Sequence, residues 1–272
     1  MRPALLAALL LSGIASAAEP PHKPFEWSEL QPGLQFARLE ATKYVTRGSP
    51  YVAVLRIDPA KFTLQPHHFK DEGLSGPLPI DEWQTRLKLP VFNAGQYAPD
   101  LGYMGTLKRE GKLLPSHESS QWLAALVTGP KAKSSPAGAV LDLHEAGPAT
   151  ALPYKNVIQS FMLRDDKGQL RTRRSAWEAN RTVVAQQRSG HLLVVVTEGA
   201  FTLAGLSDFL GEAPELDVLR AMSMDGGYEA ELAVPAKSYV TFGQWETNDS
   251  GDISLPGTHF PLPAVIAIVP KG

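Results

Sequence analysis

The chain has no cysteine among its 272 residues. Disulfides, cysteine zinc sites, thiol catalysis and a lipid anchor attached to a cysteine are therefore excluded. Its stability must come from a buried core, which a chain of this length is large enough to form.

An excess of charge of one sign is also missing, because 26 lysines and arginines are matched by 28 aspartates and glutamates. This balance provides no bulk electrostatic attraction to nucleic acid, so we expect no nucleic-acid partner. The one basic run, at 171–174, is interpreted as a solvated loop.

Long apolar runs are absent except at the N-terminus. Arg2, the apolar stretch 4–14 and Ala15-Ser16-Ala17 have the charged region, apolar core and cleavage site of a secretory signal. The stretch is shorter than the roughly 20 residues that span a bilayer. We therefore expect a signal peptide at 1–17, a periplasmic or secreted protein, and no stable membrane insertion after cleavage.

Short apolar, β-branched segments between turn residues dominate the rest of the chain and predict many strands. The expected strands are 51–57, 90–92, 123–127, 139–143, 156–163, 181–186, 192–197, 238–242 and 264–269. Helical spacing of apolar residues predicts helices at 80–87 and 202–210. We expect an α+β (mixed α/β) fold, with a large, mostly strand-built central sheet and a few packed helices. It forms a single domain over 50–272, after an N-terminal segment at 18–49.

In the segment 191–196 every position after His191 is apolar, which predicts a central strand buried on both faces. The helix at 202–210 and a strand that begins at Val218 follow it, and strand, helix, strand is a crossover unit. In such units ligands gather at the carboxyl ends of strands. Asp225 lies at that end of the second strand.

Two glycines follow Asp225. A carboxylate at the end of a strand, followed by Gly226 and Gly227, is open to a ligand. The same Asp-Gly pair is also a common hairpin turn. Motifs elsewhere in the chain are needed to decide between a ligand-binding site and a hairpin turn at Asp225.

Five further motifs accompany Asp225-Gly226-Gly227-Tyr228. They are, in chain order, Asn93-Ala94-Gly95-Gln96-Tyr97, the run 103–107 with Gly111-Lys112, Ile158-Gln159-Ser160, Arg181-Thr182 and the run 191–196. In this order and at this spacing, the chain from about 50 to 270 resembles the phosphodiester glycosidase family, the bacterial relatives of the lysosomal uncovering enzyme that removes N-acetylglucosamine from a sugar phosphodiester.

The chain departs from the family pattern at two motifs. Members usually read Asn-Gly-Gly-Phe/Met-Phe where this chain has Asn93-Ala94-Gly95-Gln96-Tyr97. A serine often follows the Asp-Gly-Gly motif, where this chain has Tyr228-Glu229-Ala230.

The resemblance implies an exported hydrolase that cleaves a glycosyl-1-phosphodiester bond and releases a sugar from a phosphorylated glycan or envelope polymer. It places the active-site aspartate at Asp225, as base or nucleophile, and a phosphate- or sugar-binding pair at Arg181-Thr182. An arginine can hold a phosphate by two parallel hydrogen bonds. Glu178 is either a second carboxylate or the ion-pair partner of Arg181.

Several polar residues are candidates for contact with the substrate. The Asn93 amide can bind a sugar hydroxyl or an N-acetyl group, or form an Asx turn. Gln159 and Ser160 lie inside an apolar strand, where they need partners. The ring of Tyr228 can stack on a sugar. The predicted substrate-binding residues are Asn93, Gly95, Gln159, Ser160, Thr182, Gly226, Gly227 and Tyr228.

No cofactor is expected, because the histidine pairs have no third ligand at zinc-like spacing. A divalent metal bound by Asp225 and Glu229 stays open as an alternative. Two other functions also stay open: a catalytically silent glycan-binding or envelope-associated protein, and a metal-dependent phosphodiesterase. The sequence does not determine the sugar, the acceptor or the oligomeric state.

Overall fold

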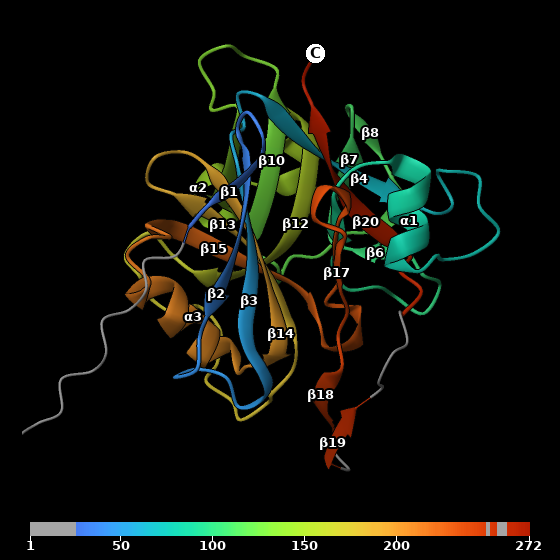
Figure 1. Cartoon of the computed structure of the whole chain (residues 1–272). Helices are drawn as coiled ribbons and strands as arrows, with labels where there is room; N and C mark the ends of the chain where they lie inside the picture. Colours follow the sequence, from blue (N-terminus) through green and yellow to red (C-terminus); the bar gives the residue numbers. More distant parts are fainter. Residues whose placement is uncertain (1–25, 249–250, 255–259) are drawn as a thin grey trace, which may run out of the picture.

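The computed structural model describes residues 26–248, 251–254 and 260–272, so the predicted signal peptide at 1–17 lies outside the described residues. Two large sheets of antiparallel strand pairs stack face to face, and helices pack on the outer surface of each (Figure 1). The fold is mostly strand-built with a few packed helices, as the sequence predicts.

The larger sheet has eleven strands. Its main path, in spatial order, is β1 (Ser28–Gln31), β2 (Leu34–Glu40), β3 (Arg47–Ile57), β14 (Leu192–Ala200), β13 (Arg181–Gln187), β15 (Val218–Gly226), β12 (Tyr154–Arg164), β10 (Ala124–Pro130) and β11 (Gly138–Asp142). β7 (Leu107–Arg109) pairs with β12 and with β8 (Lys112–Leu113). The segment 18–49 therefore contributes β1 and β2 to the same sheet as β3.

The smaller sheet has five strands, in the order β17 (Tyr239–Thr241), β16 (Leu232–Val234), β5 (Val91–Asn93), β20 (Ala264–Pro270) and β4 (Phe62–His68). Two further pairs are separate from both sheets: the hairpin β18 (Trp245–Asn248) with β19 (Gly251–Ser254), and the parallel pair β6 (Tyr103–Met104) with β9 (Ser116–His117). The hairpin projects at the bottom of Figure 1.

Side chains alternate between two cores along β14, as the two-residue period of a strand requires. Val194 and Val196 pack between the two sheets, in the same core as Phe92 and Ile266 of the smaller one. The side chain of Val195 points the other way, into the core under α3. β14 lies between β3 and β13, and residues 192–197 are buried, so the predicted central strand is confirmed.

The predicted crossover is completed by α3 (Leu203–Glu212). β14 and β15 both pair antiparallel with β13, so they run parallel to each other with one strand between them. Leu206 and Leu210 of α3 are buried against the outer face of the large sheet. Thr202 is the N-cap, because its hydroxyl accepts a hydrogen bond from the Gly205 N–H at 2.9 Å.

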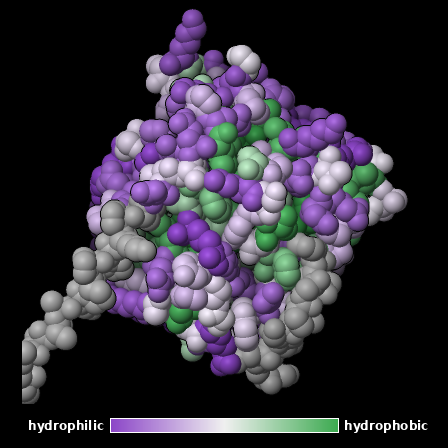
Figure 2. All heavy atoms as spheres, in the orientation of Figure 1, coloured by the Kyte–Doolittle hydropathy of each residue, from purple (hydrophilic) through white to green (hydrophobic). Residues whose placement is uncertain are grey.

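The smaller sheet is covered by α1 (Ile80–Leu87), whose predicted bounds are confirmed. Trp83 of this helix is fully buried against the sheet and donates its indole N–H to the Leu262 carbonyl at 2.9 Å. None of the helices in the described part of the chain is long and apolar enough to cross a membrane. The face seen in Figure 2 is mostly polar and is broken by apolar patches near its middle.

The predicted strands are all found, with ends that differ by up to four residues, and at two of them a cap or a turn sets the end. The strand expected at 139–143 ends at Asp142, because the Asp142 carboxylate caps α2 (Leu143–Ala146) by accepting from the His144 N–H. The strand expected at 238–242 begins at Tyr239, because Ser238 adopts a left-handed conformation that closes the preceding turn.

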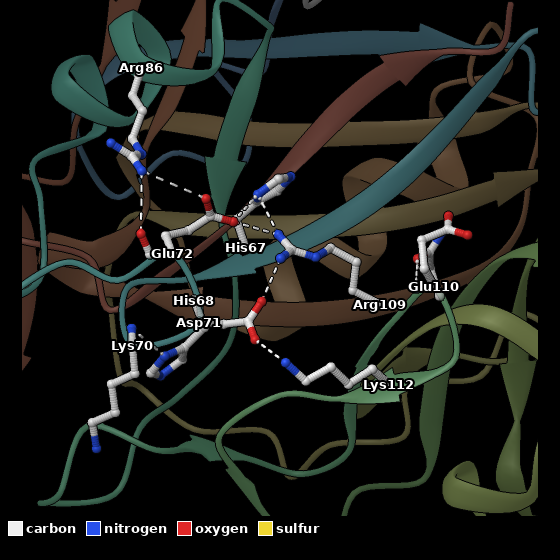
Figure 3. Close-up of polar contacts among 10 residues, drawn as sticks. His67, His68, Lys70, Asp71, Glu72, Arg86, Arg109, Glu110 and Lys112 are labelled. Carbon is white, nitrogen blue, oxygen red and sulfur yellow. Dashed lines mark hydrogen bonds and ion pairs between the residues drawn. The ribbon is translucent and has the colours of Figure 1, made fainter.

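A network of charged side chains joins the turn after β4 to the β7–β8 hairpin (Figure 3). Arg109 contacts both Asp71 and Glu72, and Lys112 binds Asp71 at 2.8 Å. His67 Nδ1 lies 2.8 Å from the Glu72 carboxylate. Burial lowers the pKa of His67 below its usual value of 6.5, since the charged imidazole is harder to desolvate.

The lowered pKa of His67 predicts a loss of stability in mild acid. Below about pH 6.5 the unfolded chain takes up a proton that folded His67 resists, so the free energy of unfolding falls. Between about pH 7.5 and about pH 5.5, we expect a smaller fall in His67→Gln than in the parent, measured by urea unfolding. The variant His144→Gln, which changes an exposed histidine, is the control. An equal fall in the parent and in His67→Gln would contradict the assignment.

Candidate functional site

Asp225 is the second-to-last residue of β15 and lies at a β-bulge. Between Ser223 and Gly226, β15 has one residue more than the facing stretch of β13 from Arg181 to Val183. Bulges of this kind change the direction of a strand and re-aim its side chains. Met224 is buried in the core, whereas Asp225 is only half-buried and accepts from the Gly226 N–H at 3.0 Å.

Asn93 joins the two sheets and contacts the backbone of Asp225. Its side-chain amide donates to the Asp225 carbonyl at 3.1 Å, and its oxygen accepts from the Thr182 hydroxyl at 2.7 Å. The same oxygen accepts from the Glu231 N–H at 3.2 Å. Asn93 is 1% exposed, so its hydrogen bonds are made within the protein.

Three carboxylates act on one another at this point: Asp225, Glu229 of the 3₁₀ turn η2 (Gly227–Glu229), and Glu246 of β18. Burial raises the pKa of Asp225 well above its usual value, and the negative charge of Glu229 adds to the effect. Burial likewise raises the pKa of Glu229 to about 6, with a further contribution from Glu246. Such a group of mutually repelling carboxylates holds protons at a pH where isolated carboxylates are ionised.

Arg181 is the cation facing these carboxylates. Its side chain is 9% exposed, and burial lowers its pKa to about 10, although Glu246 and Asp225 act in the opposite direction. Nε donates to the Phe201 carbonyl at 3.1 Å, and Nη2 to the Trp177 carbonyl at 2.9 Å. Nη1 makes no hydrogen bond to any residue that the structure describes. The two carbonyls use two of the five N–H donors of the guanidinium, so Nη1 and the second N–H of Nη2 are left for the two-bond grip on a phosphate expected from the sequence.

The glycines after Asp225 are closely packed. A Cβ on Gly226 would lie 2.9 Å from the Asn180 carbonyl oxygen, and one on Gly227 would lie 2.5 Å from Glu246 Oε2. Gly227 also has a φ of +66°, which favours glycine. Next in the chain, the ring of Tyr228 stacks on Phe260 with ring centroids 5.8 Å apart.

Three other predicted substrate-binding residues contact groups of the protein itself. The Gln159 amide bonds the backbone at Thr106, Ser119 and Trp122, and the Ser160 hydroxyl donates to the Ser223 carbonyl. Gly95 lies against Tyr103, because a Cβ on Gly95 would be 2.6 Å from the Tyr103 hydroxyl oxygen. The structure thus brings Asp225, Arg181, Asn93, Thr182 and the segment 226–228 together, while Gln159, Ser160 and Gly95 pack around them.

The other acidic candidate, Glu178, forms an ion pair with Arg47 at 3.0 Å, so of its two sequence interpretations the one as ion-pair partner of Arg181 is wrong. Within the described ranges, no group of three or more histidines, aspartates and glutamates is placed to hold a metal ion. Asp225 and Glu229 therefore stay a two-residue alternative for metal binding.

Sequence reasoning missed Glu246 and Asn180. Glu246 is 21 positions after Asp225, on a hairpin with no link to the glycine motif in the sequence. The turn residues 248–251, Asn-Asp-Ser-Gly, do indicate a hairpin there. Its docking beside Asp225 depends on tertiary contacts.

The solved structures that resemble this fold include two that cover most of this chain. A hypothetical protein from Synechocystis has a TM-score of 0.58 at 13% identity over 92% of this chain, which spans 64% of that protein. The zebrafish N-acetylglucosamine-1-phosphodiester alpha-N-acetylglucosaminidase catalytic domain has a TM-score of 0.57 at 14% identity, with coverage of 94% of this chain and 87% of that domain. At these identities the likeness shows the fold alone.

A comparison with curated protein sequences finds no match. The model of the phosphodiester glycosidase family matches residues 91–269, which include Asn93, Arg181, Asp225 and Glu246. The matched region covers more than half of the chain. The chain therefore belongs to the phosphodiester glycosidase family.

Proposed function

We propose that the protein is an exported hydrolase that cleaves a glycosyl-1-phosphodiester bond and releases a sugar from a phosphorylated glycan or envelope polymer. The observation that carries the proposal is the half-buried Asp225 carboxylate facing the charge of Arg181, in a chain of this family. The zebrafish neighbour is named for a substrate with the same bond type. The secretory signal expected at 1–17 supports export.

In the proposed reaction, the bond between the anomeric carbon and the phosphate oxygen breaks, and its electron pair leaves with the phosphate. Asp225 either takes a proton from the attacking water or attacks the anomeric carbon itself, after which water hydrolyses the glycosyl-enzyme. The raised pKa makes ionised Asp225 a stronger base than an ordinary carboxylate.

Arg181 is proposed to stabilise the negative charge that grows on the leaving phosphate. The Phe201 and Trp177 carbonyls fix its guanidinium group in place. A cation that is already fixed needs little reorganisation when the charge develops. Its Nη1 lies toward Gly226, on the Asp225 side of the arginine.

A glycan-binding protein without turnover is the second candidate. The stacked pair of Tyr228 and Phe260 favours it, because an aromatic face beside the site can bind a sugar without chemistry. Saturable binding of glycans that are never cleaved would support this candidate over the hydrolase.

The proposal is tested by incubating the purified protein with a panel of glycosyl-1-phosphodiesters and detecting free sugar by mass spectrometry. In oxygen-18 water, cleavage of the carbon–oxygen bond puts the label in the sugar. A label in the phosphate would instead identify a phosphodiesterase that cuts the phosphorus–oxygen bond. No turnover across the panel would contradict the hydrolase proposal.

Replacement of Asp225 by asparagine removes the base or nucleophile and keeps the shape of the side chain. We expect turnover to fall by at least ~10²-fold in Asp225→Asn. In the parent, kcat/KM should rise with pH through a limb well above the usual aspartate pKa of 3.8. A limb that falls with pH over this range would make Asp225 an acid instead.

The stability of the same variant is the control for folding. Because the pKa of Asp225 is raised, the protonated form is favoured in the folded protein, and stability is lost as the pH rises through that pKa. Asn mimics the protonated form, so Asp225→Asn should unfold at the same or a higher temperature than the parent at neutral pH. A large fall in its unfolding temperature would make Asp225 a structural residue.

Arg181→Lys keeps the charge but loses the planar group that both backbone carbonyls hold. Loss of one charged hydrogen bond, roughly 1.5–3 kcal/mol, corresponds to an approximately 10- to 100-fold fall in turnover of phosphodiesters. With a nitrophenyl glycoside, whose leaving group has no phosphate oxygens for the guanidinium to bind, the penalty should shrink. An equal loss on both substrates would show that Arg181 holds the fold or the sugar.

Prolonged chelator treatment should leave both the activity and the unfolding temperature unchanged. The activity and the unfolding temperature are measured after chelation and again after a divalent ion has been added back by dialysis. If chelation abolishes activity and the ion restores it, Asp225 and Glu229 become the proposed ligands.

A further inference from the structure

The hairpin β18–β19 is attached to the site through Asn180. The Asn180 N–H donates to the Trp245 carbonyl at 3.0 Å, and its side-chain oxygen accepts from the Gln244 and Trp245 N–H groups at 2.8 Å each. Farther along β18, the Thr247 N–H donates to the Glu178 carbonyl at 2.8 Å. These bonds place Glu246 beside the start of β13.

Asn180 also binds the rest of the site. Its side-chain amide donates to the Thr197 carbonyl at 2.8 Å and the Gly199 carbonyl at 3.2 Å, at the end of β14. Its own carbonyl accepts from the Gly227 N–H at 2.9 Å. One fully buried residue thus fixes the hairpin relative to the Asp-Gly-Gly segment.

Two glycines let the hairpin approach this closely. The Glu246 carboxylate lies against Gly227, where a Cβ would be 2.5 Å from Oε2. Gly243 leads into the hairpin, and a Cβ there would lie 1.7 Å from the Gly227 carbonyl oxygen. A side chain at either position would push the hairpin away from Asp225.

We propose that Glu246 is a third functional carboxylate of this site, a positioning residue that acts on Asp225 and Glu229 through its charge. The proposal rests on the proposed function and deepens it. It also explains why the hairpin is held in contact with Gly227.

Glu246 is unpaired within the described part of the chain. It is half-buried, yet its carboxylate makes no hydrogen bond or ion pair to the residues that the structure describes. Glu198 provides the comparison, because it is similarly half-buried and binds Arg38, Ser49 and Tyr239. Half-buried carboxylates kept for stability are paired in this way.

Glu246 also acts on its neighbours through its charge. Glu246 faces Arg181 of β13, Asp225 of β15, and Tyr228 and Glu229 of η2. Burial raises the pKa of Glu246, and Arg181 lowers it. Once ionised, Glu246 raises the pKa of both Asp225 and Glu229. The Asp225 carboxylate is therefore a stronger base once it is ionised, and the neighbouring Glu229 keeps its proton to a higher pH.

The test compares the pH dependence of Glu246→Gln with that of the parent. Gln keeps the size of the side chain and removes its charge, so the rising limb of kcat/KM should move to lower pH by at least about half a unit. The matched control is Glu198→Gln, which removes a paired carboxylate away from Asp225 and should not move the limb. An unmoved limb in Glu246→Gln would overturn the proposal.

A second variant tests the placement of Glu246. Gly243→Ala should displace the hairpin and give the same shift of the limb, and the double variant should shift no further than either single one. If Glu246 had a merely structural role, each substitution would lower the stability without moving the limb. The losses of stability in the two single variants would then add in the double variant.

A measurement without substrate separates this proposal from the proposed function. Carbon-13 NMR of labelled aspartate and glutamate carboxyls follows the titration of Asp225 and Glu229 directly in the full chain. Both pKa values should be lower in Glu246→Gln than in the parent. If they are, and no glycosyl phosphodiester is cleaved, the proposed reaction fails while the role of Glu246 stands. Unchanged titration curves would refute that role whether or not the protein is active.

Discussion

The structure of the site depends on the buried side chain of Asn93. This residue ends a strand of the smaller sheet, and its amide binds the Asp225 carbonyl and the Thr182 hydroxyl of the larger sheet. The Asp225 N–H donates in turn to the Ala94 carbonyl at 3.2 Å. An unsatisfied buried polar group costs roughly 1–3 kcal/mol, so these bonds hold the two sheets in one arrangement where strands β5 and β15 end. The position of the Asp225 backbone follows from that arrangement.

Next to these hydrogen bonds of Asn93, the site contains carboxylates that lack, among the described residues, the ion pairs found in a structural core. Glu198 shows the usual solution, in which a half-buried carboxylate is satisfied by Arg38, Ser49 and Tyr239 and its pKa is lowered. Asp225 and Glu229 have raised pKa values instead, because burial is not offset by donors of comparable strength. Arg181 is the cation near them, and its guanidinium is fixed by backbone carbonyls. Groups with such displaced pKa values are typical of functional sites.

Much of the fold was predictable because apolar periodicity is a local property of the sequence. β14 and α1 have the predicted character, and the helix predicted from Thr202 onward begins there, with Thr202 as its N-cap. The strands β1, β2, β4, β6 to β9 and β16, and the β18–β19 hairpin, were not predicted, since their pairing rather than their composition makes them strands. The ends at Asp142 and Ser238 were misplaced because each depends on a cap or turn geometry that apolar periodicity does not register.

The sequence by itself determined the family resemblance, the absence of cysteine chemistry, and the place of Asp225 at the end of a strand before two glycines. Only the tertiary structure decided which groups surround that aspartate. Glu246 approaches it from a hairpin, and the reason for Gly227 proved to be the close packing of that glutamate. Arg181 was placed near the site by its motif, but its bonds to the Phe201 and Trp177 carbonyls follow from how the chain turns back on β13. Burial and the distances between charges arise from contacts between distant segments, and these physical quantities set the proton affinity of Asp225.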